Sequence, residues 1–301
     1  MRQTIPPAVM HEKTILITGG TGGIGYQTAL QLARLGAHVI VTGRSAASGE
    51  TAITELRQAS GNPQVHLLLG DLATQAGVRA LATQFTQRYQ HLDVLINNAG
   101  LAAPERRLTA DGIESNFAVN VVAPWLLTTL LLPALQARTL ARVVTLTGGS
   151  HPAQIELDNL QAERAFAGLN TYSHAKLLMM AVMYEFAERV RGTSVTINVC
   201  YPGQASTTMT QQVTPDMLSG ALRLFWPLFK WATRPDNGAS AQRASRSSVY
   251  LALSPDVADM SGIYIDARCK TASWPPAVRD VTVRRHLWAY LEGLIHEGGP
   301  R

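Results

Sequence analysis

Short apolar segments alternate with longer amphipathic ones from residue 14 to residue 199, and this alternation constrains the fold most strongly. Such alternation is typical of strand–helix–strand crossover units, and strands that are apolar on both faces are covered on both sides. It predicts a single α/β domain with a doubly wound parallel sheet and helices on both faces. The predicted strands are 14–17, 39–42, 65–69, 92–96, 142–147, 195–199 and 262–265, and the predicted helices are 25–35, 47–59, 73–89, 111–136, 171–190 and 279–295.

Composition excludes several kinds of protein. The 301 residues are 46% hydrophobic, enough for one sizeable core. The net charge of +5 comes from scattered basic residues, so we expect no nucleic-acid partner. No uncharged apolar run of roughly 18 residues suggests a membrane-spanning helix. Cys200 and Cys269 have neither CxxC nor metal-binding spacing, so we expect a reduced, cytoplasmic protein without a metal.

The alternation stops near residue 204, and this divides the chain. Residues 1–12 look like a leader without the apolar core of a signal peptide, and 13–301 like one catalytic domain. Residues 204–240 predict a C-terminal helical flap inserted in that domain. Its apolar stretch 217–231 has three interpretations: a lid over a large hydrophobic substrate, a peripheral membrane contact made by aromatic and basic side chains, or ordinary core and dimer packing.

A glycine cluster joins the first strand to the first helix. Such a turn lets the backbone approach a pyrophosphate, and the helix N-terminus offers free N–H groups and the positive end of its dipole. The alternative is a flexible loop, which the position between strand and helix makes less attractive. The predicted cofactor contacts in this turn are Thr18, Gly19, Thr21, Gly23, Ile24 and Gly25.

The end of the second strand bears on the choice of cofactor. A carboxylate there would bind the ribose hydroxyls of NAD, but the chain has Arg44 and Ser45. A guanidinium suits a 2′-phosphate, so we predict NADP (NADPH), unless Arg44 is simply a solvated side chain. After the third strand, Asp71 and Leu72 are placed to hold the adenine, although Asp71 could instead cap the next helix.

Tyr172 and Lys176 are spaced one helical turn apart. An ammonium beside a phenol favours the phenolate, so we expect the pKa of Tyr172 to fall toward neutrality. A tyrosine poised in this way can exchange a proton with a carbonyl or alcohol oxygen. The spacing alone also arises by coincidence on a protein surface.

Taken together, the motifs resemble the short-chain dehydrogenase/reductase family. They occur in the family's order over about residues 12–270: Thr18–Gly25, Asp71–Leu72, Asn97–Gly100, Phe117–Asn120, Tyr172 with Lys176, and Pro202–Gly203. Segments 109–114, 126–128, 155–160 and 262–264, with His151, look like the retinol dehydrogenase-like branch. The resemblance implies a Rossmann fold and activity on hydrophobic alcohols and carbonyls.

The resemblance also implies roles for further residues. Asn98, Ala99 and Gly100 would lie beside the adenosine ribose. Asn120 would bend its helix and hold a water that links Lys176 to solvent, while Lys176 would also bind the nicotinamide ribose. The nicotinamide would be flanked by Pro202, Gly203 and Thr207. The long helices 111–136 and 171–190 are where the family pairs subunits, so a homo-oligomer is expected.

One position departs from the family pattern. The family has a serine beside the tyrosine, but alignment without gaps puts Gly148 there. A local bulge could bring Ser150 into its place, Thr147 is a second candidate, and the site could also lack this hydroxyl. We therefore predict an NADPH-dependent oxidoreductase acting on a bulky hydrophobic small molecule, with Tyr172, Lys176, Asn120 and Ser150 as catalytic residues. The alternatives are a non-redox enzyme or an NADP-binding sensor.

Overall fold

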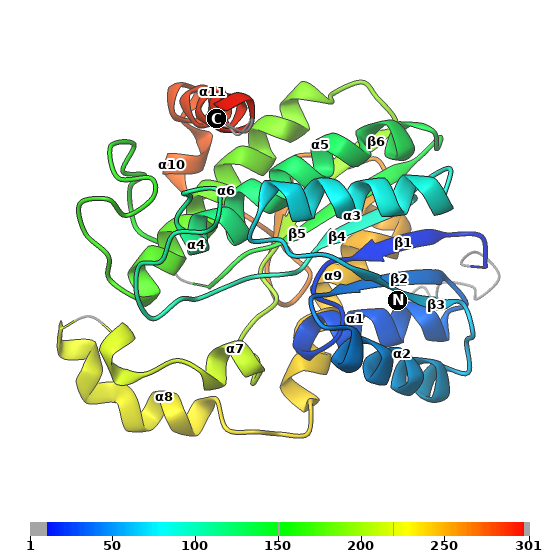
Figure 1. Cartoon of the computed structure of the whole chain (residues 1–301), viewed down its shortest axis with the longest axis horizontal. Helices are drawn as coiled ribbons and strands as arrows, with labels where there is room; N and C mark the ends of the chain where they lie inside the picture. The colour runs from blue at the N-terminus through cyan, green and yellow to red at the C-terminus, as the bar shows by residue number, and fades with distance from the viewer. Residues whose placement is uncertain (1–10, 150, 219, 298–301) are drawn as a thin grey trace.

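A parallel sheet forms the centre of the computed structural model, which describes residues 11–149, 151–218 and 220–297. Its eight strands are ordered β3-β2-β1-β4-β5-β6-β7-β8, and every neighbouring pair is parallel except β7 with β8 (Figure 1). The single α/β domain that the alternation predicted is confirmed. The strands are β1 (Thr14–Ile17), β2 (His38–Gly43), β3 (Val65–Leu69), β4 (Val94–Asn97), β5 (Ala141–Leu146), β6 (Val195–Cys200), β7 (Tyr264–Ile265) and β8 (Thr271–Ala272).

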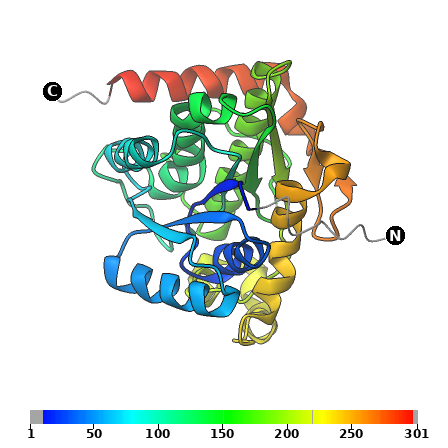
Figure 2. The same cartoon turned by 90° about the vertical axis from the view of Figure 1, so that its right-hand side faces the viewer.

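Helices cover both faces of the sheet (Figure 2). One layer holds α3 (Gln75–Arg88), α5 (Ala123–Gln136), α6 (Leu169–Arg189) and α11 (Val281–Glu297); the other holds α1 (Gly23–Arg34), α2 (Ala46–Ser60) and α9 (Ala239–Leu253). Neighbouring strand residues point to opposite layers, so Leu16 belongs to the first core while Ile15 and Ile17 belong to the second. The shorter helices are α4 (Ser115–Phe117), α7 (Thr208–Gln211), α8 (Trp226–Ala232) and α10 (Pro276–Arg279).

The predicted helix 111–136 begins later than its sequence pattern suggests. Gly112 has a left-handed φ of 71°, and the buried carboxylate of Glu114 accepts hydrogen bonds from the N–H groups of Asn116 and Phe117, which starts α4. A π-helical turn, Ala118–Val122, then joins α4 to α5. Among the described residues, Ser115–Gln136 is the one helical run long and apolar enough to cross a bilayer, and 72% of its most apolar window is buried, as in a core helix.

Helix α9 is absent from the predicted elements. It packs along α1, and its serines 240, 245, 247 and 248 are all buried. The hydroxyls of Ser245, Ser247 and Ser248 donate to carbonyls one turn back, and Ser248 also pairs with Thr28 at 2.9 Å between oxygens. The Ser240 hydroxyl accepts from the N–H of Ser206. Serine is common in loops, and the buried serines interrupt the apolar positions Ala241, Ala244 and Leu251 of this helix, which weakens the pattern in the sequence.

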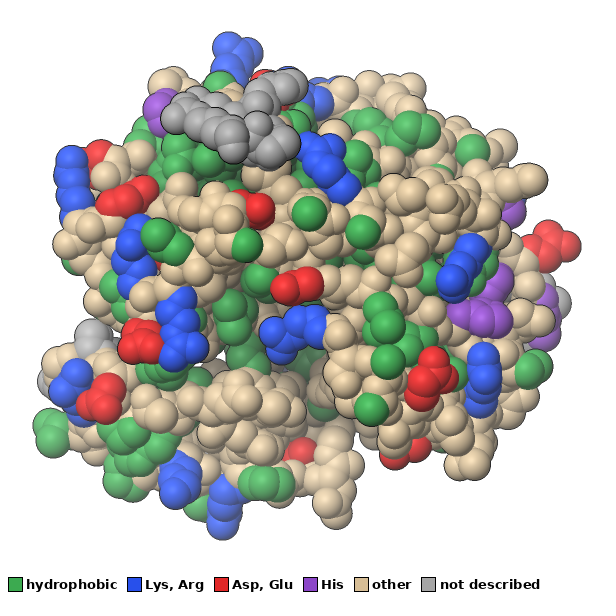
Figure 3. Space-filling model, in the orientation of Figure 1, with side chains coloured by type: hydrophobic (Ala, Val, Ile, Leu, Met, Phe, Trp, Pro, Cys, Tyr) green, Lys and Arg blue, Asp and Glu red, His purple; other side chains and the backbone are tan. Residues whose placement is uncertain are grey.

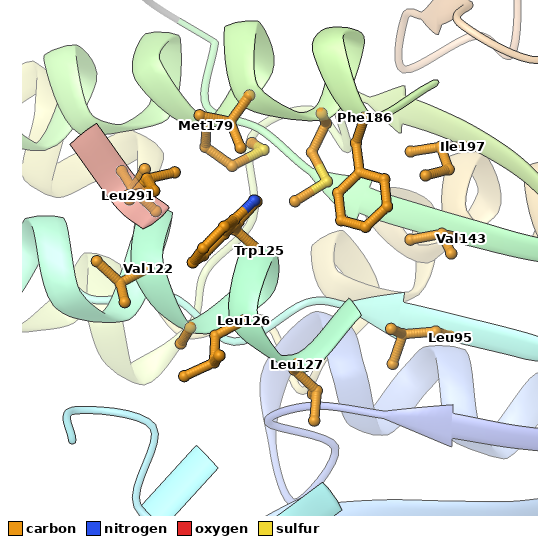
Figure 4. Packing of buried hydrophobic residues seen from close by; sticks show 14 of the residues in the cluster. Leu95, Val122, Trp125, Leu126, Leu127, Val143, Met179, Phe186, Ile197 and Leu291 are labelled. Atoms are coloured by element: carbon orange, nitrogen blue, oxygen red, sulfur yellow. The ribbon is translucent and has the colours of Figure 1, made fainter. Parts of the chain in front are cut away.

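Helix α11 completes the larger core. Trp288 lies edge-on to Trp125 of α5, with ring centroids 5.7 Å apart, and edge-on to Phe186 of α6 at 5.1 Å. Figure 4 shows Trp125 surrounded by side chains from α5, α6 and α11. Because α11 packs on α6, it covers part of the helix through which the family resemblance predicts that subunits pair. Oligomerisation remains a prediction.

Candidate active site

A cavity of about 780 Å³ opens at the carboxyl ends of the strands. Parallel α/β sheets bind their ligands at this edge. Figure 3 shows this face hollowed between the body of the domain and the segment that carries α7 and α8. The cavity is lined by the glycine turn, the ends of β2 to β6, the start of α6 and the flap.

The glycine turn is fitted closely to the strand beside it. A methyl group added to Gly25 would overlap the Gly19 carbonyl oxygen and the Nδ2 atom of Asn98. That Nδ2 donates to the carbonyls of Thr18 and Gly19, so Asn98 fixes the turn against the end of β4. By contrast, nothing lies within 4 Å of a methyl group added to Gly22, and no side chain caps α1 at that residue. The turn thus leaves room, and free N–H groups, for a phosphate.

Charged residues at the other strand ends are few. Arg44 is exposed and lines the cavity just after β2. Ser45 does not line it; its hydroxyl accepts a weak hydrogen bond from the N–H of Ser48 as the cap of α2. Asp71 lines the cavity and accepts from the N–H of Ala73, while Thr74 caps α3, so the alternative of Asp71 as that cap is wrong. Among the described lining residues, Asp71 is the sole acidic side chain.

Tyr172 and Lys176 project from the first turns of α6 into the same cavity. Lys176 is 5% exposed, and its Nζ donates to the Leu146 carbonyl oxygen at 3.1 Å. Burial lowers the pKa of Lys176 to about 8. Burial, with a smaller contribution from the nearby phenol of Tyr201, raises the pKa of Tyr172 to about 12. The prediction that the pKa of Tyr172 falls is therefore wrong. The desolvation of the phenol outweighs the effect of the neighbouring ammonium, whose Nζ lies 5.9 Å from the ring centre.

Asn120 lies in the π-helical turn, behind the cavity wall. Its Nδ2 donates to the carbonyls of Leu101 and Asn116, and its Oδ1 accepts from the N–H of Leu101. A methyl group added to Gly100 would lie 3.2 Å from Asn120 Oδ1 and 3.4 Å from Lys176 Nζ. The two side chains thus face one small space, which is where the predicted water would lie. The turn also departs from α-helical bonding at Asn120, as expected.

The structure agrees with the alignment, because it places Gly148 beside Tyr172, where the family has a serine. A methyl group added to Gly148 would lie 3.5 Å from Tyr172 Cε1 and 3.7 Å from Tyr172 Oη, both ordinary van der Waals distances. Thr147 is among the residues that line the cavity, and its Oγ1 is buried with no partner among the described residues. Ser150 lies outside the described residues, so its role stays a prediction.

The remaining predicted contacts divide into two groups. Thr18, Gly25, Ser45 and Asn120 support the cavity without lining it. The other predicted residues all line it: Gly19, Thr21, Gly23, Ile24, Arg44, Asp71, Leu72, Asn98, Ala99, Gly100, Tyr172, Lys176, Pro202, Gly203 and Thr207. The motifs did not single out Tyr201, although it directly precedes the Pro202–Gly203 pair and also lines the cavity.

The flap presents two faces. Met217, Leu218 and Phe229 line the cavity and form an apolar wall on the flap side. Leu224, Leu228 and Trp231 are 81%, 60% and 61% exposed. One segment therefore borders the cavity on one side and solvent on the other.

The fold, the glycine turn and the Tyr172–Lys176 pair define a nicotinamide-dependent dehydrogenase. Residues 13–218 match the model of the short chain dehydrogenase family, and the chain belongs to this family. The predicted resemblance to the retinol dehydrogenase-like branch of the family is also confirmed. Retinol dehydrogenase 14 of Mus musculus is 36% identical to this chain, and the match covers 96% of this chain and 87% of that protein. Polyprenol dehydrogenase of Homo sapiens is 33% identical to this chain, and the match covers 87% of this chain and 79% of that protein.

Solved structures agree with the fold. An uncharacterised protein from Mycobacterium paratuberculosis is similar over 97% of this chain and 98% of that chain, with a TM-score of 0.73 and 25% identity. Family membership implies a nicotinamide cofactor and dehydrogenase or reductase chemistry.

Proposed function

We propose that the protein is an NADPH-dependent oxidoreductase that interconverts a bulky hydrophobic carbonyl compound and its alcohol. The observation that carries this proposal is the position of Tyr172, which opens into a cavity of about 780 Å³. The apolar wall formed by Met217, Leu218 and Phe229 encloses that cavity. This volume is near the upper end of ordinary ligand sites, so it has room for a dinucleotide and an apolar substrate together.

The cofactor preference rests on Arg44. It stands at the end of β2, and Asp71, after β3, is the sole acid among the described lining residues. A guanidinium binds a phosphate through two parallel hydrogen bonds, whereas a ribose that lacks the phosphate gains nothing comparable from it. The uncapped N-terminus of α1 beside Gly22 would hold the pyrophosphate, and Lys176 would hold the nicotinamide ribose.

The protein residues would handle the proton. When bound, the reduced nicotinamide supplies a hydride to the carbonyl carbon. Tyr172 donates its phenolic proton to the carbonyl oxygen, and a pKa raised to about 12 keeps that proton in place at neutral pH. Lys176 lies beside the resulting phenolate and stabilises it, and Asn120 faces the same space for proton resupply.

The substrate class is proposed from the flap and the relatives. The similar proteins are named for retinol and polyprenol, both long apolar alcohols. The flap lines the cavity with apolar side chains, while Leu224, Leu228 and Trp231 face outward beside Arg223 and Lys230. We include a peripheral contact with a lipid surface in the proposal, because it would bring such substrates to the entrance.

The test is a rate measurement on the purified protein. All-trans-retinal, a polyprenal and acetaldehyde would each be offered with NADPH or NADH, and cofactor oxidation followed by absorbance. We expect turnover with the two long aldehydes and NADPH, and a loss of about 100-fold or more in Tyr172→Phe. Arg44→Ala should raise the KM for NADPH about 10- to 100-fold and leave that for NADH unchanged. The exposed Arg79, which does not line the cavity, provides the matched control Arg79→Ala.

Three results would refute the proposal. One is no oxidation of either cofactor with any substrate, and a second is a Tyr172→Phe protein as active as the wild type. The third is tight NADPH binding without turnover, which would favour a binding or sensor protein.

A further inference from the structure

The ends of β5 and β6 bring a second phenol to the serine position. Leu146 pairs with Cys200, and the N–H of Thr147 donates to the Cys200 carbonyl at 2.9 Å. The register therefore places Thr147 opposite Tyr201, and Gly148–Gly149 follow Thr147 directly in the chain. Val199 belongs to the core on the α6 side and Cys200 to the opposite core. By the alternation of strand side chains, Tyr201 points to the α6 side, where Tyr172 lies.

The glycine pair is fitted to both phenols. A methyl group added to Gly149 would lie 2.5 Å from Tyr201 Oη and 2.6 Å from Tyr201 Cζ, so the ring of Tyr201 lies directly across that glycine. A methyl group added to Gly148 would lie 3.7 Å from Tyr172 Oη. Consecutive Cα atoms are about 3.8 Å apart, so the two phenol oxygens flank one short piece of backbone.

We propose that Tyr201 replaces the missing serine: its Oη donates a hydrogen bond to the substrate oxygen that Tyr172 protonates. This inference rests on the proposed function. As the hydride forms the new C–H bond and the C=O π bond breaks, charge grows on the oxygen and the nicotinamide becomes oxidised. Tyr172 gives its proton to that oxygen. Tyr201 keeps its own proton and stabilises the charge as the transition state is reached.

Tyr201 is better placed for this role than Thr147. Both residues line the cavity. The Oγ1 of Thr147 is fully buried, whereas Tyr201 is half-buried. A phenol is also a stronger acid than an aliphatic hydroxyl, so it donates a stronger hydrogen bond to a developing oxyanion.

The experiment compares single variants with a rescue. We expect Tyr201→Phe to lower kcat/KM for the aldehyde about 100-fold and to leave the KM for NADPH unchanged. Gly148→Ser in the Tyr201→Phe background should restore most of the loss, because the space beside Gly148 accepts a side chain and puts a hydroxyl next to Tyr172. A merely structural role for Tyr201 would not be rescued in this way.

Three further variants complete the design. Gly149→Ala should reproduce the loss, because its methyl group displaces the Tyr201 ring. Tyr264→Phe is the matched control, because it removes a phenol hydroxyl from β7, outside the cavity, and it should behave like the wild type. Thr147→Val tests the competing hydroxyl, and its loss should be smaller than that of Tyr201→Phe.

The outcomes separate the inference from the function on which it rests. An active wild type with an equally active Tyr201→Phe overturns the inference alone. So does a loss in Thr147→Val that exceeds the loss in Tyr201→Phe, or a failure of Gly148→Ser to rescue. A wild type that turns over no substrate overturns the proposed function, and the inference with it.

Discussion

Replacing Lys176 by methionine should make the protein more stable and less active. Burial lowers the pKa of this lysine from 10.5 to about 8, so at neutral pH the fold holds a charged ammonium that it disfavours by about 3 kcal/mol. Methionine has a similar shape and no charge. It loses the hydrogen bond from Nζ to the Leu146 carbonyl, which is worth about 1 kcal/mol. The net gain is about 2 kcal/mol, or about 4 °C in Tm for a domain of this size.

The gain should depend on pH in one direction. Below pH 8 the lysine is protonated in both the folded and the unfolded chain, and the whole cost is present. Between about pH 8 and 10.5 the unfolded chain still holds the proton and the folded chain has lost it, so wild-type stability rises relative to the variant. The advantage of Lys176→Met should therefore shrink as the pH rises through this window and reverse before its upper end, because the cost of about 3 kcal/mol that disappears exceeds the net gain of about 2 kcal/mol.

Thermal unfolding of the cofactor-free protein, followed by circular dichroism at pH 7 and at pH 10, measures both effects. Lys176→Arg keeps the charge and should show no gain at pH 7. The reasoning is refuted if Lys176→Met is less stable than the wild type at pH 7, or if its advantage is the same at both pH values.

Two further predictions test the glycine turn and the flap. Gly25→Ala should lower the stability by about 2–4 kcal/mol, because its methyl group pushes against the Gly19 carbonyl and Asn98. Gly22→Ala should cost less than about 1 kcal/mol of stability yet weaken NADPH binding. Equal Tm values for the two variants would contradict this. The double variant Leu224→Asp/Leu228→Asp should co-sediment about 10-fold more weakly with anionic lipid vesicles. Leu108→Asp, which changes an exposed leucine outside the flap, should bind the vesicles like the wild type. Equal vesicle binding by the wild type and both variants, or no binding by the wild type, would rule out the lipid contact.

Much of the fold can be read from the sequence because parallel strands covered on both faces are apolar throughout. Each predicted strand from Thr14 to Val199 lies within about two residues of an observed one. Helix α9 was missed in this way, since buried serines, which donate their hydroxyls to the preceding turn, interrupt its apolar positions. The late start of α4 depends on the buried Glu114 carboxylate, whose capping role appears only once Asn116 and Phe117 are in place.

The parts of the candidate site that a single short sequence motif forms could be predicted from the sequence. The glycine turn and the Tyr172–Lys176 spacing are of this kind, and both line the cavity. The relation between Gly149 and Tyr201 is different, because it depends on the register of two strands whose partners are more than 50 residues apart in the chain. The direction of the Tyr172 pKa shift also escaped prediction, since it is decided by how completely the phenol is desolvated.

The packing of α11 has a consequence for the order in which the chain folds during synthesis. Trp288 contacts Trp125 and Phe186, so the larger core is closed by residues that the ribosome makes after the strands β1 to β6. Until about residue 295 has left the exit tunnel, α6 emerges with an apolar face that no later segment yet covers, although the glycine turn and β1 to β6 are already available to pair. Domains generally fold as units, so this one would complete its core only after α11 has emerged.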